Sequence, residues 1–265
     1  MTHAWSVILG LVQGLAEFLP ISSSAHLALI PRIFHITDPV LSSLQFDIAL
    51  HLGSGLAILF ALWRDWTDVV RGAVRGDGFS RKFVGFLLVT SIPGAIFGVL
   101  FDKQAESTFR NPLLIASTLI VMGVVLWAVD RYARRAEPLE NMTWTRAALI
   151  GLAQAFAIVP GVSRSGVTMT TGRALGLSRD ATARYSFMAA LPIIVGAGLF
   201  GLRDVPLREL LSLDWVLGFG ASLVSSVIAM RWMLGYVRKH SFVVFTYYRL
   251  AIGLLVIALV LLRAI

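Results

Sequence analysis

The sequence predicts an all-α protein: a polytopic helical bundle in a membrane, with six transmembrane helices and two re-entrant helical hairpins in an inverted-topology repeat. Of its 265 residues, 57% are hydrophobic and only 14% are charged, whereas a soluble domain carries about 25% charged residues. Apolar runs of about 18 residues or more recur along the chain, long enough for transmembrane helices. These runs are continuous, whereas the strands of a membrane β-barrel alternate polar and apolar residues.

Six segments are apolar enough and long enough to cross a bilayer. We expect them near residues 45–63, 83–101, 113–130, 183–202, 215–235 and 242–262. Residues 1–265 then form a single membrane domain. No Lys or Arg precedes Arg32, so the first segment lacks the basic start of a signal peptide, and we expect it to stay in the mature protein.

One stretch that interrupts an apolar run occurs twice. Residues 10–26 read GLVQGLAEFLPISSSAH, and residues 151–166 read GLAQAFAIVPGVSRSG. The shared residues are the pairs Gly10 and Gly151, Leu11 and Leu152, Gln13 and Gln154, and Pro20 and Pro160. Unsatisfied backbone and charge are costly in hydrocarbon, so such interruptions persist where they line a cavity. The chemistry should therefore lie in these two stretches.

Each repeated stretch predicts a helix, a break and a second helix. Residues 5–18 would form a helix of about 21 Å, which is short of the roughly 30 Å hydrocarbon core. Pro20 ends that helix, and the serines at 22–24 can cap another that runs to about Ile30, before Pro31. Residues 145–176 repeat the pattern, with the break at 160–161 and a cap at Ser163 or Ser165.

Each half of the chain, about 1–135 and 144–265, thus holds one hairpin and three spans. Because three is odd, the second half enters the membrane inverted, as in inverted-repeat transporters. Of the 23 Lys and Arg residues, 14 fall in loops on one side and 6 in loops on the other. The side with 14 should be cytoplasmic. Both termini and the mouth of the first hairpin then face outside.

The first hairpin carries a carboxylate in an apolar run. Gln13 and Glu17 are four residues apart and share a helix face that points to the break. A charge at this depth costs roughly 2.5–3.5 kcal/mol or more unless it is paired or hydrated. Glu17 could form a structural ion pair across the bundle, or it could bind a cation or a catalytic arginine.

The hydroxyls that follow suggest an anion site. Ser22, Ser23 and Ser24 begin a half-helix whose free N–H groups and dipole attract negative charge. His26 lies one turn further on, on the face of Ser22 and Ser23. Hydroxyl plus imidazole suits nucleophilic attack or proton delivery, although capping serines beside a surface histidine would look the same.

The second hairpin strengthens the functional interpretation. Arg164 stands between Ser163 and Ser165 at the start of another half-helix, and arginine holds phosphate in bidentate fashion. This convergence of donors suits a phosphate or pyrophosphate group. Asp47 and His51, four residues apart on the first span, either complete the site or form a polar pair that packs on the hairpin.

Two further arginines lie inside apolar segments. We expect Arg231 and Arg249, near segment ends, to snorkel toward the membrane surface. The net charge of +8 reflects loop charges that orient the protein, and no nucleic acid partner is expected.

These motifs resemble the undecaprenyl-diphosphatase family, the membrane phosphatases of bacitracin resistance. QGLAEFLPISSSAH is similar to the family's (E/Q)GxxEFxPxSSxGH element, PGVSRSG matches its second motif, and FDIALHLGSGLA resembles its next segment. The resemblance extends from end to end in length and hydropathy. Two departures are Ala25, where glycine is usual, and Gln13, where many members have glutamate and hence one more charge for a metal.

The resemblance implies an enzyme of a bacterial plasma membrane that hydrolyses undecaprenyl diphosphate to the monophosphate and inorganic phosphate, recycling the lipid carrier for cell-wall synthesis. It implies a catalytic core of Glu17, His26 and Arg164. The nucleophile stays open between a serine, of which we favour Ser23, and a water activated by His26. The resemblance also implies phosphate contacts from serines at 22–24, 163 and 165, and a divalent cation, Mg2+ or Ca2+, at Glu17 and Gln13.

The partners implied are a polyprenyl diphosphate lipid, reached from the periplasmic side, and the surrounding membrane lipids. The oligomeric state stays open, a homodimer included. Two rival functions remain: an inverted-repeat transporter, such as a flippase for the same lipid, and a non-catalytic lipid-binding subunit. Only an enzyme requires bond cleavage, and only it gives a reason for an arginine beside hydroxyls and a histidine.

Overall fold

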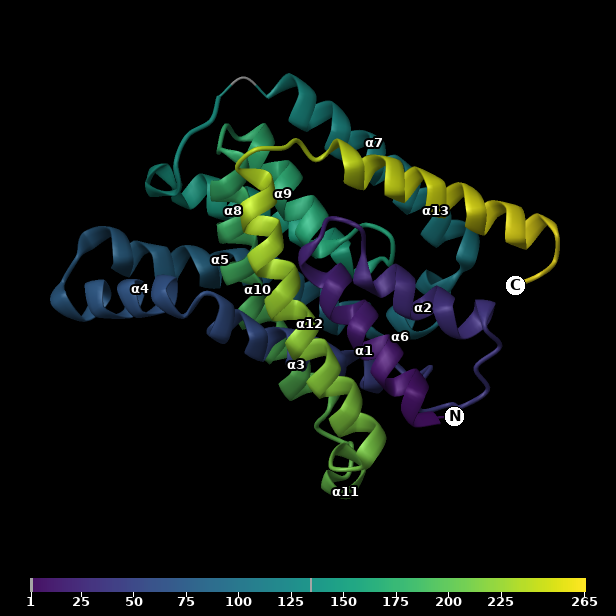
Figure 1. Cartoon of the computed structure of the whole chain (residues 1–265). Coiled ribbons are helices and arrows are strands. Elements are labelled where there is room, and N and C mark those ends of the chain that lie inside the picture. Colours follow the sequence, from purple (N-terminus) through teal and green to yellow (C-terminus); the bar gives the residue numbers. More distant parts are fainter. Residues whose placement is uncertain (1, 134) are drawn as a thin grey trace.

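The computed structural model describes residues 2–133 and 135–265, and its regular elements there are helices (Figure 1). Six of them are long and apolar enough to cross a membrane. These are α3 (Leu44–Ala61), α5 (Gly78–Leu100), α7 (Pro112–Tyr132), α10 (Arg179–Gly201), α12 (Leu213–Val237) and α13 (Val243–Leu261). The expected number of spans is confirmed, and their bounds agree with the sequence prediction to within about five residues.

Shorter helices make up the two repeated stretches. The first comprises α1 (Thr2–Phe18) and α2 (Ser23–Ile33), and the second comprises α8 (Trp144–Ala155), η3 (Phe156–Ile158) and α9 (Arg164–Ala174). The remaining elements are the connectors α4 (Trp63–Arg75), α6 (Asp102–Glu106), η1 (Thr108–Arg110), η2 (Leu139–Asn141) and α11 (Leu207–Leu210). Both breaks fall at the prolines, as the sequence predicts.

Side-chain caps fix where several helices begin. A side-chain oxygen at the N-cap accepts an otherwise unpaired backbone N–H of the first turn. The capping residues are Ser43 before α3, Asp77 before α5, Asn111 before α7, Thr143 before α8, Ser163 before α9 and Ser178 before α10.

The repeated glycines bring each first hairpin helix close to a span from the other half of the chain. Helix α1 lies along α12, and α8 lies along α5. A Cβ on Gly10 would come within 2.2 Å of the Gly218 carbonyl oxygen, and a Cβ on Gly151 within 2.8 Å of the Thr90 carbonyl oxygen. Only glycine permits backbones to approach so closely, which explains why it recurs.

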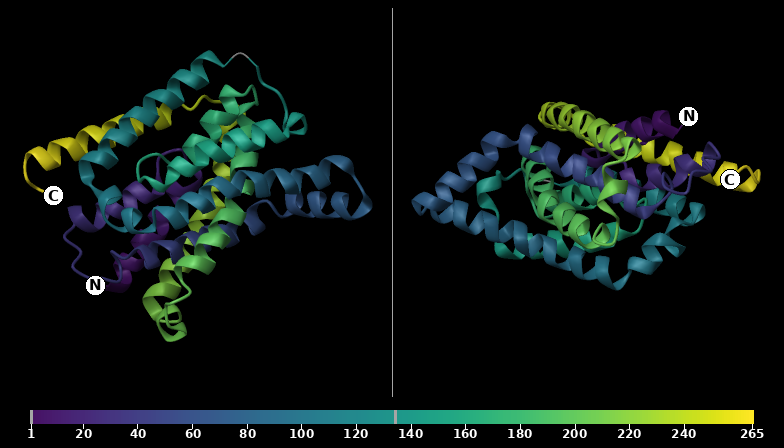
Figure 2. Two further views of the ribbon diagram at one scale, coloured as in Figure 1. Left: turned by 180° about the vertical axis from the view of Figure 1, so that it is seen from behind. Right: turned by 90° about the horizontal axis from the view of Figure 1, so that it is seen from below.

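Helix α10 occupies the middle of the bundle and packs against α3, α5, α9 and α12. Its Tyr185, Phe187 and Met188 are at most 1% exposed. By contrast, α7 and α13 run side by side at the edge of the molecule, as Figure 2 shows. Helix α9 of the second hairpin lies between α10 and this pair, packing against α10 on one side and α7 on the other.

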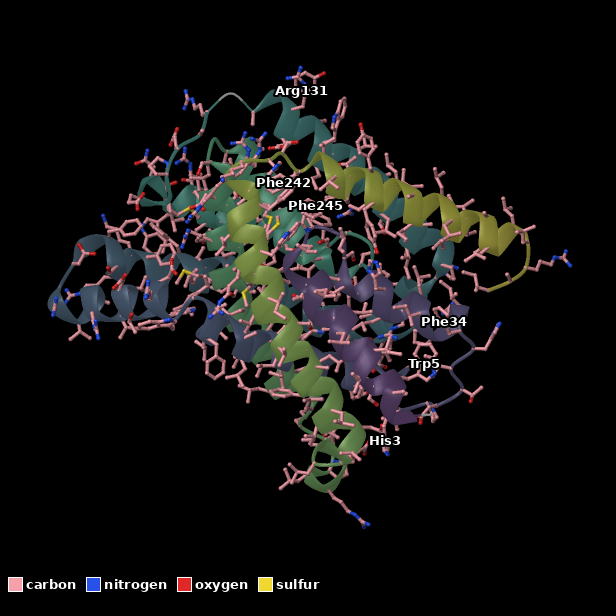
Figure 3. The ribbon with its side chains drawn as sticks, viewed as in Figure 1. His3, Trp5, Phe34, Arg131, Phe242 and Phe245 are labelled. Atoms are coloured by element: carbon pink, nitrogen blue, oxygen red, sulfur yellow. The ribbon has the colours of Figure 1, made fainter. Side chains whose placement is uncertain are left out.

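The open end of the first hairpin is closed by aromatic packing. Trp5 of α1 and Phe34, just after α2, lie together with ring centroids 5.3 Å apart (Figure 3). Helix α2 continues through Pro31 to Ile33, so the expectation that it ends before Pro31 was wrong. The proline sits in the last turn, where the helix has few further hydrogen bonds to lose.

The longest of the connecting helices, α4, was not expected. The segment 64–82, treated as a loop from its charge, contains α4, which folds back along the start of α5 to form an arm that projects from the bundle (Figure 1). Its partly buried residues, such as Trp66 and Val69, pack toward the core, while Val74 is 80% exposed. The amphipathic spacing of these apolar residues was the signal.

Candidate active site

Glu17, at the end of α1, gathers four donors around one buried carboxylate. Arg164 Nη2 lies 2.9 Å from Oε1. Ser23 Oγ donates to Oε2 at 2.5 Å, and Gln13 Nε2 donates to the same oxygen at 3.0 Å. His51 Nε2 lies 3.3 Å from Oε2. The residue is only 5% exposed, and a carboxylate so buried requires such partners.

The two breaks meet at this point. Ser22 Oγ accepts a hydrogen bond from the Gly161 N–H at 3.0 Å, and Ser165 Oγ donates to the Leu19 carbonyl at 2.9 Å. Ser22 and Ser163 both hold left-handed backbone, with φ of 73° and 72°. Non-glycine residues rarely adopt this region, and where they do the surrounding structure holds them there, often at functional sites.

The serines predicted to contact phosphate therefore form hydrogen bonds with other groups of the protein in this structure. Ser22 and Ser24 place their hydroxyl oxygens 3.3 Å apart, and Ser163 and Ser165 repeat that distance. Ser163 also caps α9, accepting the Gly166 N–H at 3.0 Å. The same spacing of hydroxyls thus flanks Ser23 in one break and Arg164 in the other.

The guanidinium of Arg164 is oriented from two sides. Its Nη1 donates to the Ser186 carbonyl of α10 at 2.7 Å, while Nη2 reaches Glu17. The group also lies 5.9 Å from the centre of the Phe18 ring. Ser186 was not foreseen from the sequence, because nothing in the pattern around it shows that α10 passes beside the second break.

The two histidines have different surroundings. His51 Nδ1 lies 2.7 Å from the Asp47 carbonyl oxygen and its Nε2 faces Glu17, so both ring nitrogens face acceptors. His51 is thereby a partner of Glu17 from α3. His26 Nδ1 lies 2.7 Å from the Ser22 carbonyl oxygen, and its Nε2 meets the hydroxyl of Tyr248. His26 is not bonded to Ser23, whose hydroxyl is directed to Glu17.

Asp47 and His51 have separate roles. The carboxylate of Asp47 pairs with Arg110 and not with any group of the Glu17 cluster. Its backbone carbonyl holds the ring of His51. The structure therefore brings His51 to Glu17 and leaves the Asp47 side chain in an ion pair between α3 and η1.

The expectation that Arg249 snorkels was wrong. Its side chain is 0% exposed, and it donates to the Pro20 carbonyl at 3.1 Å and to the Gly161 carbonyl at 2.5 Å, one in each break. Nε donates to the Leu119 carbonyl at 3.1 Å. Arg249 is the seventh residue of α13, about 10 Å along the helix, a depth that could have signalled its inward position. Arg231 on α12 is exposed, as expected.

The donor set can be compared with the needs of a divalent cation, which prefers several oxygen ligands. Among the described residues, no group of three or more His, Asp and Glu side chains could hold a metal. Yet Gln13 Oε1, on the amide beside Glu17, is buried with no hydrogen-bond partner. One carboxylate and one free amide oxygen fit a cation whose other ligands come from substrate and water.

Ion pairs anchor the far end of the second hairpin. Asp130 of α7 accepts hydrogen bonds from Arg173 Nε at 3.3 Å and from Arg179 Nε at 2.7 Å. At the start of α8, Arg146 donates to Glu137 of the preceding loop at 2.8 Å, and this hydrogen bond lowers the pKa of the Glu137 carboxyl. The end of α9 is thereby fixed to α7, α10 and the loop before α8.

Comparison with known proteins identifies the family. Residues 6–255 match the family model described as bacitracin resistance protein BacA. An undecaprenyl-diphosphatase of Moorella thermoacetica is 46% identical over 267 residues, covering 99% of this chain and 100% of that protein. The protein of the same name from Pelotomaculum thermopropionicum is 45% identical over 260 residues (98% and 97% covered). That from Elusimicrobium minutum is 37% identical over 264 residues (99% and 100% covered). Since the family model spans residues 6–255 and these relatives cover nearly the whole chain, the chain belongs to the bacitracin resistance protein BacA family.

Proposed function

We propose that this multi-pass membrane protein is an undecaprenyl-diphosphatase, which hydrolyses undecaprenyl diphosphate to undecaprenyl phosphate and inorganic phosphate and so recycles the lipid carrier for peptidoglycan synthesis. The names of its relatives support this reaction. The observation that carries it is the position of Glu17, which holds the hydroxyl of one break and the guanidinium of the other. A transporter would not require a carboxylate that holds a serine hydroxyl and an arginine side chain together.

The geometry supports Ser23 as the nucleophile. Its hydroxyl already donates to Glu17 Oε2, so Glu17 is placed to accept the proton as the serine oxygen attacks the terminal phosphorus. Arg164 has guanidinium N–H groups left for phosphate oxygens, where they would stabilise the charge that develops on the transferred group. Undecaprenyl phosphate is then the leaving group.

We also propose that a divalent cation assists, held by Glu17 and the free Gln13 Oε1 together with substrate oxygens and water. Such a cation would supply charge neutralisation at the diphosphate. The protein's own groups, Arg164 and the N–H groups at the starts of α2 and α9, bind and orient the phosphates.

The reaction can be tested in detergent, where no sealed compartment exists and vectorial transport cannot be observed. Purified protein should release phosphate from farnesyl or longer polyprenyl diphosphates, with the monophosphate a poor substrate. Glu17→Ala should lower turnover by orders of magnitude without unfolding the protein, because it releases both Ser23 and Arg164. A chelator should suppress the activity of the unaltered protein.

The decisive comparison is between binding of the lipid diphosphate and release of inorganic phosphate. If folded protein binds the lipid diphosphate but releases no phosphate with any divalent cation supplied, the phosphatase proposal fails and a lipid transporter becomes the better account.

We further propose that the two halves of the chain form an inverted repeat in the plasma membrane, with re-entrant hairpins and a site that opens to the periplasm. The equivalent pairs α1 with α12 and α8 with α5 support this arrangement, as do the matching backbone angles of Ser22 and Ser163. The uneven loop charge supports the orientation.

The orientation predicts which side of the membrane single cysteines face. The chain has no cysteine, so Val74→Cys in α4 and Gln104→Cys in α6 can be labelled individually at exposed positions. An impermeant thiol reagent should reach residue 74 only from the cytoplasm and residue 104 only from outside. Labelling of both from one side would contradict the inverted repeat.

A further inference from the structure

The hydroxyl of Tyr248 contacts a ring nitrogen of His26. Its oxygen is 2.6 Å from His26 Nε2. The two rings are stacked, with centroids 5.7 Å apart and planes inclined by 20°. Tyr248 belongs to α13, far from either break in the sequence, and precedes Arg249. The same helix therefore carries the residue that joins the breaks and one that holds the histidine.

The other ring nitrogen determines what this contact means. His26 Nδ1 lies 2.7 Å from the Ser22 carbonyl oxygen, which can only accept, so Nδ1 carries the hydrogen. A neutral imidazole has one N–H, and its second nitrogen then presents a lone pair. Nε2 is thus the only basic nitrogen of His26, and the Tyr248 hydroxyl donates to it.

His26 differs in this respect from His51, the other histidine near the site. His51 faces an acceptor on each side, one of them the Glu17 carboxylate, and has no lone pair to offer. The ring of His26 is bonded to a carbonyl and a hydroxyl, and the charged group facing it from α13 is Arg249. Of these two histidines, only His26 presents a ring nitrogen that can accept a proton.

We propose that Tyr248 is a positioning residue for His26. Its hydroxyl and the Ser22 carbonyl together fix the ring in one tautomer and one orientation, with Nε2 ready to accept a proton. The role rests on the proposed phosphatase function, in which Ser23 is phosphorylated and then hydrolysed. Tyr248 acts through the histidine and does not itself touch the reacting atoms.

The positioning of His26 serves the second step of the reaction, in which phosphate is released from Ser23. A water oxygen bonds to phosphorus while the bond from phosphorus to Ser23 Oγ breaks. The water proton passes to His26 Nε2 as the Tyr248 side chain moves off this nitrogen. Ser23 Oγ recovers the proton that Glu17 accepted in the first step, and His26 later returns its proton to solvent.

Tyr248→Phe tests this role, because it keeps the stacked ring and removes only the hydroxyl. We expect kcat for polyprenyl diphosphate hydrolysis to fall about tenfold with KM within about twofold, as orientation of a general base affects the chemical step. In protein labelled with 15N-histidine, the Nε2 resonance of His26 should move while Nδ1 keeps its bonded hydrogen. His26→Gln identifies the resonances.

Tyr247→Phe is the matched control: it removes a hydroxyl from the neighbouring residue, which is 67% exposed, and should change neither kcat nor the spectrum. Unchanged His26 resonances in Tyr248→Phe would overturn the proposal. So would a raised KM with normal kcat, which would make Tyr248 a lipid contact. The spectrum needs no turnover, so a protein without phosphatase activity would refute the proposed function separately from the contact with His26.

Discussion

Arg164→Lys should lower turnover by two to three orders of magnitude although it keeps the positive charge. The guanidinium spans two fixed acceptors, the Ser186 carbonyl through Nη1 and Glu17 through Nη2. A lysine ammonium offers a single point of contact, so it cannot hold both and still present a planar pair of donors to phosphate. Loss of one preorganised donor to developing charge typically lowers kcat by about 10²–10³.

This prediction is measured as kcat for phosphate release in detergent, with circular dichroism to show that the variant is folded. Arg231→Lys is the control, since Arg231 is exposed on α12. This variant should leave kcat almost unchanged. Turnover within about twofold of normal in Arg164→Lys would reduce the role of Arg164 to simple charge neutralisation.

Arg249→Met should both destabilise the protein and abolish activity. The side chain is fully buried and donates to backbone carbonyls of Pro20 and Gly161, which belong to different breaks. Methionine fills the space but leaves those carbonyls without this donor, at a cost on the order of 1–3 kcal/mol for each buried group left unpaired. The breaks would keep the hydrogen bonds of Ser22 and Ser165 between them but lose the bridge through Arg249, so the position of Ser23 relative to Arg164 would be less well fixed.

Thermal unfolding in detergent measures the loss of stability. Phosphate release well below the unfolding temperature measures the loss of activity. Arg249→Lys should recover part of the stability and little activity, because an ammonium can bond to one break but cannot bridge both. Arg231→Met, at the exposed position on α12, controls for loss of charge. An Arg249→Met protein with normal thermal stability would contradict this account of how the breaks are joined.

The spans could be predicted from the sequence because lipid imposes a simple rule: a long, continuous apolar run must be helical. The breaks could be predicted because Pro20 and Pro160 cannot continue a helix without losing a hydrogen bond. The extension of α2 to Ile33 and the existence of α4 could not be read in this way. Both depend on packing against neighbouring helices, which a rule based on composition and proline does not include.

The site residues also divide into those that could be predicted from the sequence and those that could not. Glu17, Ser23 and Arg164 stood out because polar groups in apolar segments need a reason, and the structure brings them together. Tyr248 was missed, and Arg249 was expected at the membrane surface, because their partners, a histidine and backbone carbonyls, lie far away in the sequence. Such contacts leave no local pattern, and the depth of Arg249 within α13 was the one available signal. Asp47 was ambiguous because its partner, Arg110, lies in a connector outside every motif.

The inward position of Arg249 has a consequence for how the protein is made. An arginine near the centre of a lone helix opposes insertion by roughly 2.5–3.5 kcal/mol, whereas its carbonyl acceptors at Pro20, Leu119 and Gly161 all precede α13 in the chain. During synthesis these acceptors therefore emerge before the arginine that needs them. Biogenesis should thus proceed in order, with α13 entering the bilayer as a partner of hairpins already in place.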